Sequence, residues 1–231
     1  PISFDAASTV SWSSGTATTI SWNHTVSNGS SSILVVVTGV RTTGSSLAHT
    51  TIVTYAGSTL TRAVFGRNET ATSAIYRTEL WYKINPTSGT NAIQVTAANT
   101  TRSLAAGQMA VSFLDTTGIG NTLGSSGNSS APSGAITLTT AGSWSVSAVK
   151  SNVAVALTTV SGETKRANST AGTDYQSVGD AAPGSSGSNT FNWTGGAAQP
   201  WALAILELLP STFVAPVSGL IGPLALVGVG Q

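Results

Sequence analysis

The hydrophobic residues of this chain come in short runs, and this pattern restricts its fold more than any other feature. No stretch repeats apolar residues at helical spacing over several turns. Instead, short runs of β-branched and aromatic residues alternate with clusters of Gly, Ser, Asn and Thr. Such alternation is typical of strands joined by turns. The sequence therefore predicts an all-β fold, a two-sheet β-sandwich of the jelly-roll or Greek-key type.

Individual strands can be placed from the same pattern. Residues 8–12 and 18–22 are near copies, Ser-Thr-Val-Ser-Trp and Thr-Thr-Ile-Ser-Trp, and we expect them to form a hairpin. Residues 32–40 are apolar on both faces, which predicts a central strand. Residues 115–134 are rich in Gly, Ser, Asn and Thr, and we expect a long connection between sheets there. Further strands are expected at 52–55, 60–65, 75–84, 92–96, 107–114, 136–139, 144–150, 153–160, 190–193 and 201–208.

The chain carries unusually little charge. Charged residues make up 7% of it, where about 25% is usual. Ser, Thr, Gly and Asn take their place, so the surface is hydrated without strong repulsion between copies. The formal net charge is +1 and the basic residues are scattered, which argues against a nucleic-acid partner. The absence of cysteine excludes disulfides, thiolate metal sites and a Cys nucleophile.

Two features favour an extracellular, cell-surface location. The chain begins at Pro1 without a Met or an apolar leader, and we interpret it as the mature form of an exported protein. It also contains seven Asn-x-Ser/Thr sequences, which predict a glycoprotein, although a chain this rich in Asn, Ser and Thr forms them by chance as well. The candidate acceptors are Asn23, Asn28, Asn68, Asn99, Asn128, Asn168 and Asn192.

A set of motifs in the first half of the chain resembles a known module. Tyr55-x-Gly57-x-x-Leu60-Thr61 is followed by Glu79-Leu80-Trp81-Tyr82 and by Asn85-Pro86-x-x-Gly89-Thr90, and the chain opens with Ile2-Ser-Phe-Asp-Ala. Together they resemble a β-sandwich module found in many bacterial and archaeal secreted and cell-surface proteins. The resemblance covers roughly residues 2–209. It implies one β-sandwich domain over residues 1–210, and it provides no catalytic residue that could be assigned to this chain.

Residues 211–231 form an uncharged apolar tail after the last expected strand. Its glycines and prolines interrupt the apolar run, which disfavours a membrane-spanning helix. In an extended strand, apolar side chains would occupy both faces and require burial on two sides. The residues that carry this expectation are Leu220, Ile221, Leu224, Leu226, Val227 and Val229.

The tail needs a strand-shaped slot, because apolar contact alone does not offset the entropy of ordering it. The slot lies either in the same domain or in a neighbouring copy. The second arrangement is donor-strand complementation, and a contact of this kind that does not close builds a filament. It resembles the assembly of pili and threads by strand donation. Residues 1–12 are the competing donor.

The titratable residues give little support for an enzyme. The two histidines, His24 and His49, are expected at the surface or at a strand edge, and no Gly-x-Ser-x-Gly elbow occurs. Glu79 and Glu207 lie within apolar strands. We expect each to pair with an Arg or Lys or to point to solvent.

For Glu79 the expected partner is Arg77 or Lys83. Asp174 and Asp180 flank Tyr175 and are the weak candidates for calcium, but no Asp-x-Asp loop occurs. No cofactor and no metal are predicted.

The six tryptophans are either core residues or a platform for sugar rings. Trp193, in Asn192-Trp-Thr-Gly-Gly, is expected to be partly exposed and is the candidate ligand aromatic. The sequence predicts a structural subunit of an extracellular filament or pilus, a homopolymer that serves adhesion or surface scaffolding, with glycans or cell surfaces as further partners. The alternative is a monomeric surface adhesin or carbohydrate-binding module.

Overall fold

The computed structural model describes residues 1–10, 18–43, 49–69, 74–98, 107–152, 158–159, 162–171, 174–181, 186–195 and 197–211. These residues form four antiparallel sheets and no helix, which confirms the all-β sandwich class. The strands of the first half are β1 (Ser3–Val10), β2 (Thr19–Val26), β3 (Ser32–Thr43), β4 (Thr50–Tyr55), β5 (Ser58–Thr59), β6 (Thr61–Asn68), β7 (Ala74–Ile84), β8 (Gly89–Ala97) and β9 (Gln108–Leu114). Those of the second half are β10 (Thr116–Ser129), β11 (Ser133–Leu138), β12 (Trp144–Ser151), β13 (Thr158–Thr159), β14 (Glu163–Ala171), β15 (Asp174–Ala181), β16 (Gly187–Thr194) and β17 (Gln199–Pro210).

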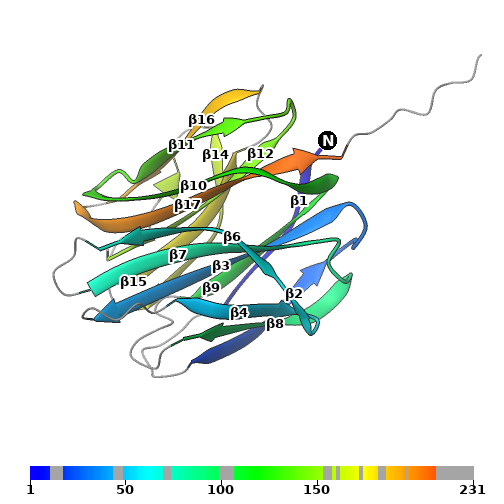
Figure 1. Ribbon diagram of the computed structural model, residues 1–231, viewed down its shortest axis with the longest axis horizontal. Coiled ribbons are helices and arrows are strands. Elements are labelled where there is room, and N and C mark those ends of the chain that lie inside the picture. The colour runs from blue at the N-terminus through cyan, green and yellow to red at the C-terminus, as the bar shows by residue number, and fades with distance from the viewer. Residues whose placement is uncertain are drawn as a thin grey trace, which may run out of the picture.

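The sheets stack in four layers where the sequence predicts two (Figure 1). Inner sheet 1, in the order β1-β9-β3-β7-β6, packs face to face with inner sheet 2, in the order β10-β17-β12-β15-β14. Outer sheet 1, β2-β8-β4-β5, covers the other face of inner sheet 1. Outer sheet 2, β11-β16-β13, covers the other face of inner sheet 2.

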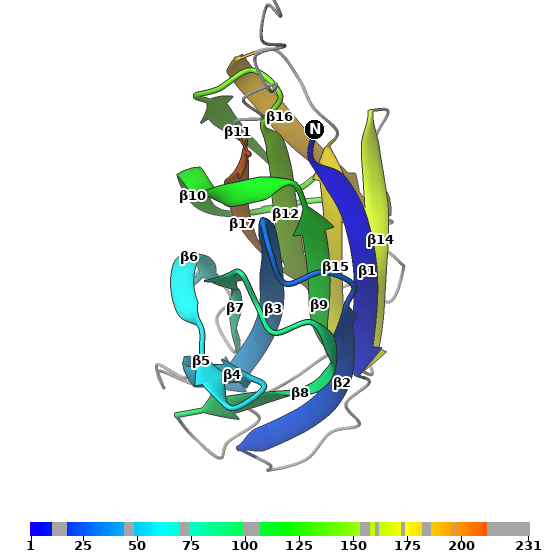
Figure 2. The same ribbon diagram turned by 90° about the vertical axis from the view of Figure 1, so that its right-hand side faces the viewer.

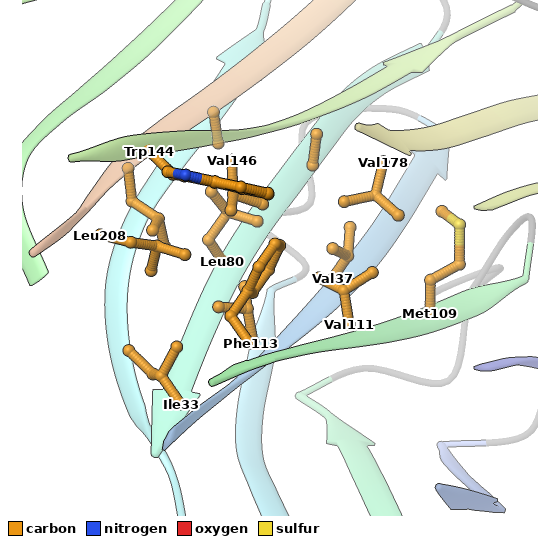
Figure 3. Close-up of a cluster of buried hydrophobic side chains, with 14 of the residues drawn as sticks. Ile33, Val37, Leu80, Met109, Val111, Phe113, Trp144, Val146, Val178 and Leu208 are labelled. Atoms are coloured by element: carbon orange, nitrogen blue, oxygen red, sulfur yellow. The ribbon is translucent and has the colours of Figure 1, made fainter. Parts of the chain in front are cut away.

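Each of the three interfaces between layers holds its own hydrophobic cluster. The central cluster joins Val37 and Phe113 of inner sheet 1 to Trp144 and Val178 of inner sheet 2 (Figure 3). The rings of Phe113 and Trp144 meet edge to face with centroids 5.7 Å apart, a favoured aromatic geometry. Because successive side chains of a strand point to opposite faces, β3 supplies both the central cluster and the cluster under outer sheet 1. The predicted central strand at 32–40 is confirmed.

The two halves of the chain share one topology. In inner sheets 1 and 2, strands β1, β9, β3, β7 and β6 correspond in order to β10, β17, β12, β15 and β14. In the outer sheets β2, β8 and β4 correspond to β11, β16 and β13. Residues 89–96, Gly-Thr-Asn-Ala-Ile-Gln-Val-Thr, align without a gap to residues 187–194, Gly-Ser-Asn-Thr-Phe-Asn-Trp-Thr. The described residues therefore contain an internal structural repeat.

The two repeats meet reciprocally at the edges of the inner sheets. Strand β6 packs against β10 and β17, and the corresponding strand β14 packs against β1 and β9. Figure 2 shows both meetings, β6 beside β10 on one side of the molecule and β14 beside β1 on the other. The inner sheets thus close on each other along both edges.

Two predictions about strands are wrong. The near copies at 8–12 and 18–22 do not form a hairpin, because β1 pairs with β9 in inner sheet 1 and β2 pairs with β8 in outer sheet 1. The expected connection at 115–134 contains the long strand β10, which pairs with β17. Its glycines conceal the strand from a sequence pattern. At Gly124 a Cβ would lie 2.1 Å from the carbonyl oxygen of Phe65, so a close approach of β6 requires glycine there.

Strands β14 and β15 were not expected from the sequence, since their polar and charged residues hide the strand pattern. In the structure, β15 is buried along its whole length. Its acidic residues meet partners from neighbouring strands: Asp180 pairs with Arg166 of β14, and Asp174 pairs with Arg41 of β3. Burial of these carboxylates is possible because each has a cation within reach.

Candidate functional site

The predicted inter-subunit residues Leu220, Ile221, Leu224, Leu226, Val227 and Val229 lie outside the described residues, and so do Trp12 and Asn99. Ser211 is the last residue that the structure describes, and its backbone N–H donates to the carbonyl oxygen of Asp115 at 2.8 Å. The strand before it, β17, is paired on both sides, with β10 and with β12. The chain therefore leaves β17 at the turn between β9 and β10.

Trp193 is not exposed. Its side chain is completely buried between inner sheet 2 and outer sheet 2, its ring stacks on Phe191, and its Nε1–H donates to Oγ of Ser147 at 3.0 Å. The prediction that Trp193 is partly exposed is wrong, because the strand alternation of β16 turns this side chain inward, away from any ligand at the surface. The other described tryptophans, Trp22, Trp81, Trp144 and Trp201, are at most 9% exposed.

The candidate glycan acceptors occupy different environments. Asn23, Asn28, Asn128 and Asn168 are exposed, and Asn192 is half-buried. Asn68 is 1% exposed, and its Nδ2 donates to the carbonyl oxygens of Gly127 and Trp201. A glycan on Asn68 would require both hydrogen bonds to break.

His24 is buried, contrary to the prediction of a surface or edge position, and it belongs to a continuous chain of hydrogen bonds. Ser112 donates to Asp5 at 2.8 Å, so its oxygen accepts the Nε2–H of His24, with the two atoms 3.1 Å apart. Nδ1 of the neutral ring then accepts from Ser8, at 2.8 Å. The Ser8 hydroxyl donates to Nδ1 and the Ser112 oxygen accepts from Nε2, so these two serines determine which tautomer of His24 is present.

This arrangement resembles a serine triad in composition but differs in geometry. Ser112 stands between His24 and Asp5, whereas a triad carboxylate contacts the imidazole directly. Burial lowers the pKa of His24 to about 4, although Asp5 pulls it the other way, so the ring is a weak base near neutral pH. The network instead links β2 of outer sheet 1 to β1 and β9 of inner sheet 1, and we assign it a structural role.

The two strand glutamates are satisfied in different ways. Glu79 is fully buried and accepts from Nε of Arg77 at 2.7 Å and from Nε1 of Trp81 at 3.2 Å, which confirms the predicted pairing with Arg77. Glu207 accepts backbone N–H groups of Asn121 at 2.9 Å and Thr139 at 2.7 Å. Burial raises the pKa of Glu207, but these donors hold it below its ordinary value. The backbone thus provides the donors that the sequence pattern assigned to an Arg or Lys.

The two aspartates considered for calcium are engaged by cations of the protein. Asp174 lies 3.0 Å from Nη1 of Arg41 and 3.7 Å from Nζ of Lys150, and Asp180 pairs with Arg166. Among the residues that the structure describes, no group of three or more His, Cys, Asp or Glu side chains could hold a metal ion. The geometry gives no support to a calcium site at these aspartates.

The outward faces of the two outer sheets carry hydroxyl and amide side chains. On outer sheet 1, Thr25 of β2 and Thr90 of β8 pair through their hydroxyls at 2.8 Å, and Asn23 and Gln94 are exposed. On outer sheet 2, Thr158 and Thr194 pair in the same way at 2.8 Å. Neither face has a charged side chain among the described strand residues. Strands β2 and β11 lie at edges of these two sheets.

None of the described residues forms a helix with the length and hydropathy of a membrane span. Comparison with protein-family models, with curated proteins and with solved structures finds no match to this chain.

Proposed function

We propose that this protein is a structural subunit of an extracellular filament that assembles by β-strand donation, with residues 211–231 as the donor, and that it serves adhesion or surface scaffolding. The observation that carries the proposal is the position of β17. It is an interior strand of inner sheet 2, paired on both sides, and it ends at Pro210. The four sheets of the described residues are assembled from strands that precede this apolar, uncharged segment. We propose that the segment completes a sheet of a second copy.

The N-terminal segment is the weaker donor. Strand β1 pairs with β9 over Ser3–Val10, and Phe4 packs against Phe113 of the same chain. Donation of β1 to another copy would remove a strand from inner sheet 1 and expose part of the central cluster, at the energetic cost of its buried apolar area.

The surface of the described residues suits association between copies. Among the described strands, the eight-residue edge strand β2 pairs on one side only, and strands of this kind are templates for further pairing. Its outward side chains are Thr, Ser and Asn, so an approaching copy meets no like charge. In the structural repeat β11 holds the corresponding edge position.

The test is deletion of residues 212–231. Because β17 ends at Pro210, we expect the truncated chain to keep its far-ultraviolet circular dichroism and its denaturation midpoint. We also expect it to stay monomeric in analytical ultracentrifugation, under conditions in which the full chain forms filaments visible by electron microscopy. A synthetic peptide of residues 211–231 should bind the truncated chain.

A matched pair of substitutions separates strand donation from a general effect of the tail. Leu224→Asp with Leu226→Asp places charge on one face of the donor and should abolish filaments. Thr212→Asp with Ser218→Asp adds the same charge at polar positions and should leave them intact. Filaments from the truncated chain, or a full chain that stays monomeric at every concentration, would overturn the proposal.

One observation favours the alternative, a monomeric carbohydrate-binding module. The exposed rows of Thr and Asn on the outer sheets can hydrogen-bond to sugars. The alternative loses the aromatic platform among the described tryptophans, since all of them are buried. A glycan array probed with the truncated monomer tests this alternative separately from filament formation.

A further inference from the structure

A buried lysine and a buried aspartate face each other inside inner sheet 2. Lys150 of β12 is fully buried. It pairs in register with Gln176 of β15, and Asp174 lies two residues along β15 on the same face. Nζ of Lys150 and Oδ1 of Asp174 are 3.7 Å apart, and the Asp174 side chain is 6% exposed. The two side chains meet at the end of the interface between the inner sheets.

The polar groups around this pair are incompletely satisfied. Three buried atoms there make no hydrogen bond: Oδ1 of Asp174, Nε of Arg41 and Oε1 of Gln176. The other carboxylate oxygen of Asp174, Oδ2, accepts from Nη1 of Arg41 at 3.0 Å. Buried polar groups without partners are rare in folded proteins and call for an explanation. As a simple ion pair, this cluster leaves a buried carboxylate oxygen without a hydrogen bond.

We infer that Lys150 and Asp174 condense to an amide, so that a covalent side-chain cross-link joins β12 to β15. Nζ attacks Cγ of Asp174, a new C–N bond forms, and the bond from Cγ to Oδ1 breaks. Oδ1 leaves as water and takes two protons from the ammonium group. Oδ2 remains as the amide oxygen. One ammonium and one carboxylate thus give one amide and one water, and nothing is oxidised or reduced.

The surroundings favour both the attack and the product. The nucleophile must be the neutral amine, and burial lowers the pKa of Lys150 to about 8, although Asp174 opposes this. Arg41 is placed to stabilise negative charge on Oδ2 as the tetrahedral intermediate forms. Well-oriented groups in one molecule reach effective concentrations of about 10⁵–10⁸ M. A neutral amide also removes the desolvation cost of a buried ion pair.

The amide cross-link would stabilise this chain as disulfides stabilise other proteins. The chain has no cysteine, and a cross-link between neighbouring interior strands restricts the unfolded state in the way that a disulfide does. It would close a loop that contains β13 and β14. The inference does not depend on filament assembly, because both residues lie within one copy.

The mass of the purified full chain tests whether the amide between Lys150 and Asp174 forms. Measured under denaturing conditions, it should fall below the mass of the sequence by one water molecule. Trypsin should fail to cut after Lys150, and fragmentation should identify a linked pair of segments that contain Lys150 and Asp174. A denatured wild-type chain with the full sequence mass overturns the inference, and so does a water loss located at other residues.

Variants identify the participants through the same mass measurement, which does not require them to be stable. Lys150→Gln and Asp174→Ala should each restore the full mass expected for the variant. Asp180→Asn, at the other buried aspartate of β15, is the matched control and should keep the water loss. In Arg41→Gln a fraction of the chains should remain uncondensed, and this fraction should decline with time after refolding. Retention of the water loss in the Lys150 variant contradicts the assignment.

Discussion

At the scale of single residues, His24 makes the stability of the protein depend on pH. Its pKa is about 4 in the folded chain and 6.5 as the ordinary value. Between these values the unfolded chain binds a proton that the folded chain does not. Stability therefore decreases as pH falls from 6.5 to 4, by about 3 kcal/mol in all. Burial raises the pKa of Asp5, but hydrogen bonds from Ser27 and Ser112 hold it below its ordinary value. Asp5 therefore loses its contribution to stability only at still lower pH.

We therefore expect His24→Gln to flatten this pH dependence. Denaturation by urea at a series of pH values, on wild type and variant, measures the slope. The variant should be less stable than wild type at neutral pH, because the hydrogen bonds to Ser8 and Ser112 are disturbed. If the free energy of unfolding of the variant changes with pH between 6.5 and 4 as steeply as that of wild type, groups other than His24 cause the loss of stability.

Trp193 provides a second prediction at this scale. Its ring is fully buried, so Trp193→Ala should cost about 3–5 kcal/mol of stability. Thr194, the next residue, points outward, and Thr194→Ala should change stability by less than about 0.5 kcal/mol. Denaturant midpoints measure both variants. A loss in Trp193→Ala no larger than that in Thr194→Ala would contradict the burial of this ring.

At the scale of elements, glycines determine how closely the repeats approach each other. A Cβ at Gly124 of β10 would lie 2.1 Å from the carbonyl oxygen of Phe65 on β6. At Gly118, on the same strand, the nearest atom would be 3.6 Å away, which is an ordinary contact. We expect Gly124→Ala to cost about 1–3 kcal/mol, since backbone must move, and Gly118→Ala to be nearly neutral. Equal effects in thermal unfolding would contradict the contact between β6 and β10.

The elements also show where sequence patterns succeed. The expected strands at 75–84, 144–150 and 201–208 are present in β7, β12 and β17, because their apolar residues are frequent enough to mark them. Strand β10 is not predicted, since its many Gly, Ser and Asn residues resemble a connection between strands. At Gly124 the glycine is required by the closeness of β6 and not by a turn. Strands β14 and β15 were missed because their charges are paired across strands. A partner far away in the sequence leaves no local signal.

At the scale of the whole molecule, the two repeats share one core. The central cluster takes Val37, Leu80 and Phe113 from residues 1–114, and Trp144 and Val178 from the second repeat. We therefore expect residues 1–114 and residues 115–211, expressed separately, to be unfolded or aggregated, because each would expose one face of its inner sheet. The full chain should unfold in a single transition by circular dichroism and by tryptophan fluorescence. A stable, monomeric 1–114 fragment would show that the repeats are independent domains.

By itself the sequence determined the all-β class, the central position of β3, the scarcity of charge and the apolar character of residues 211–231, and it restricted the expected partners of Glu79 to Arg77 and Lys83 or solvent. These properties are carried by composition and by residues close together along the chain. Only the tertiary structure decided that β1 and β2 belong to different sheets, that residues 116–129 form a strand, and that His24 and Trp193 are buried. It also decided that Lys150 meets Asp174. Which face of a strand is covered depends on sheets supplied by distant parts of the chain, and no local pattern of residues specifies it.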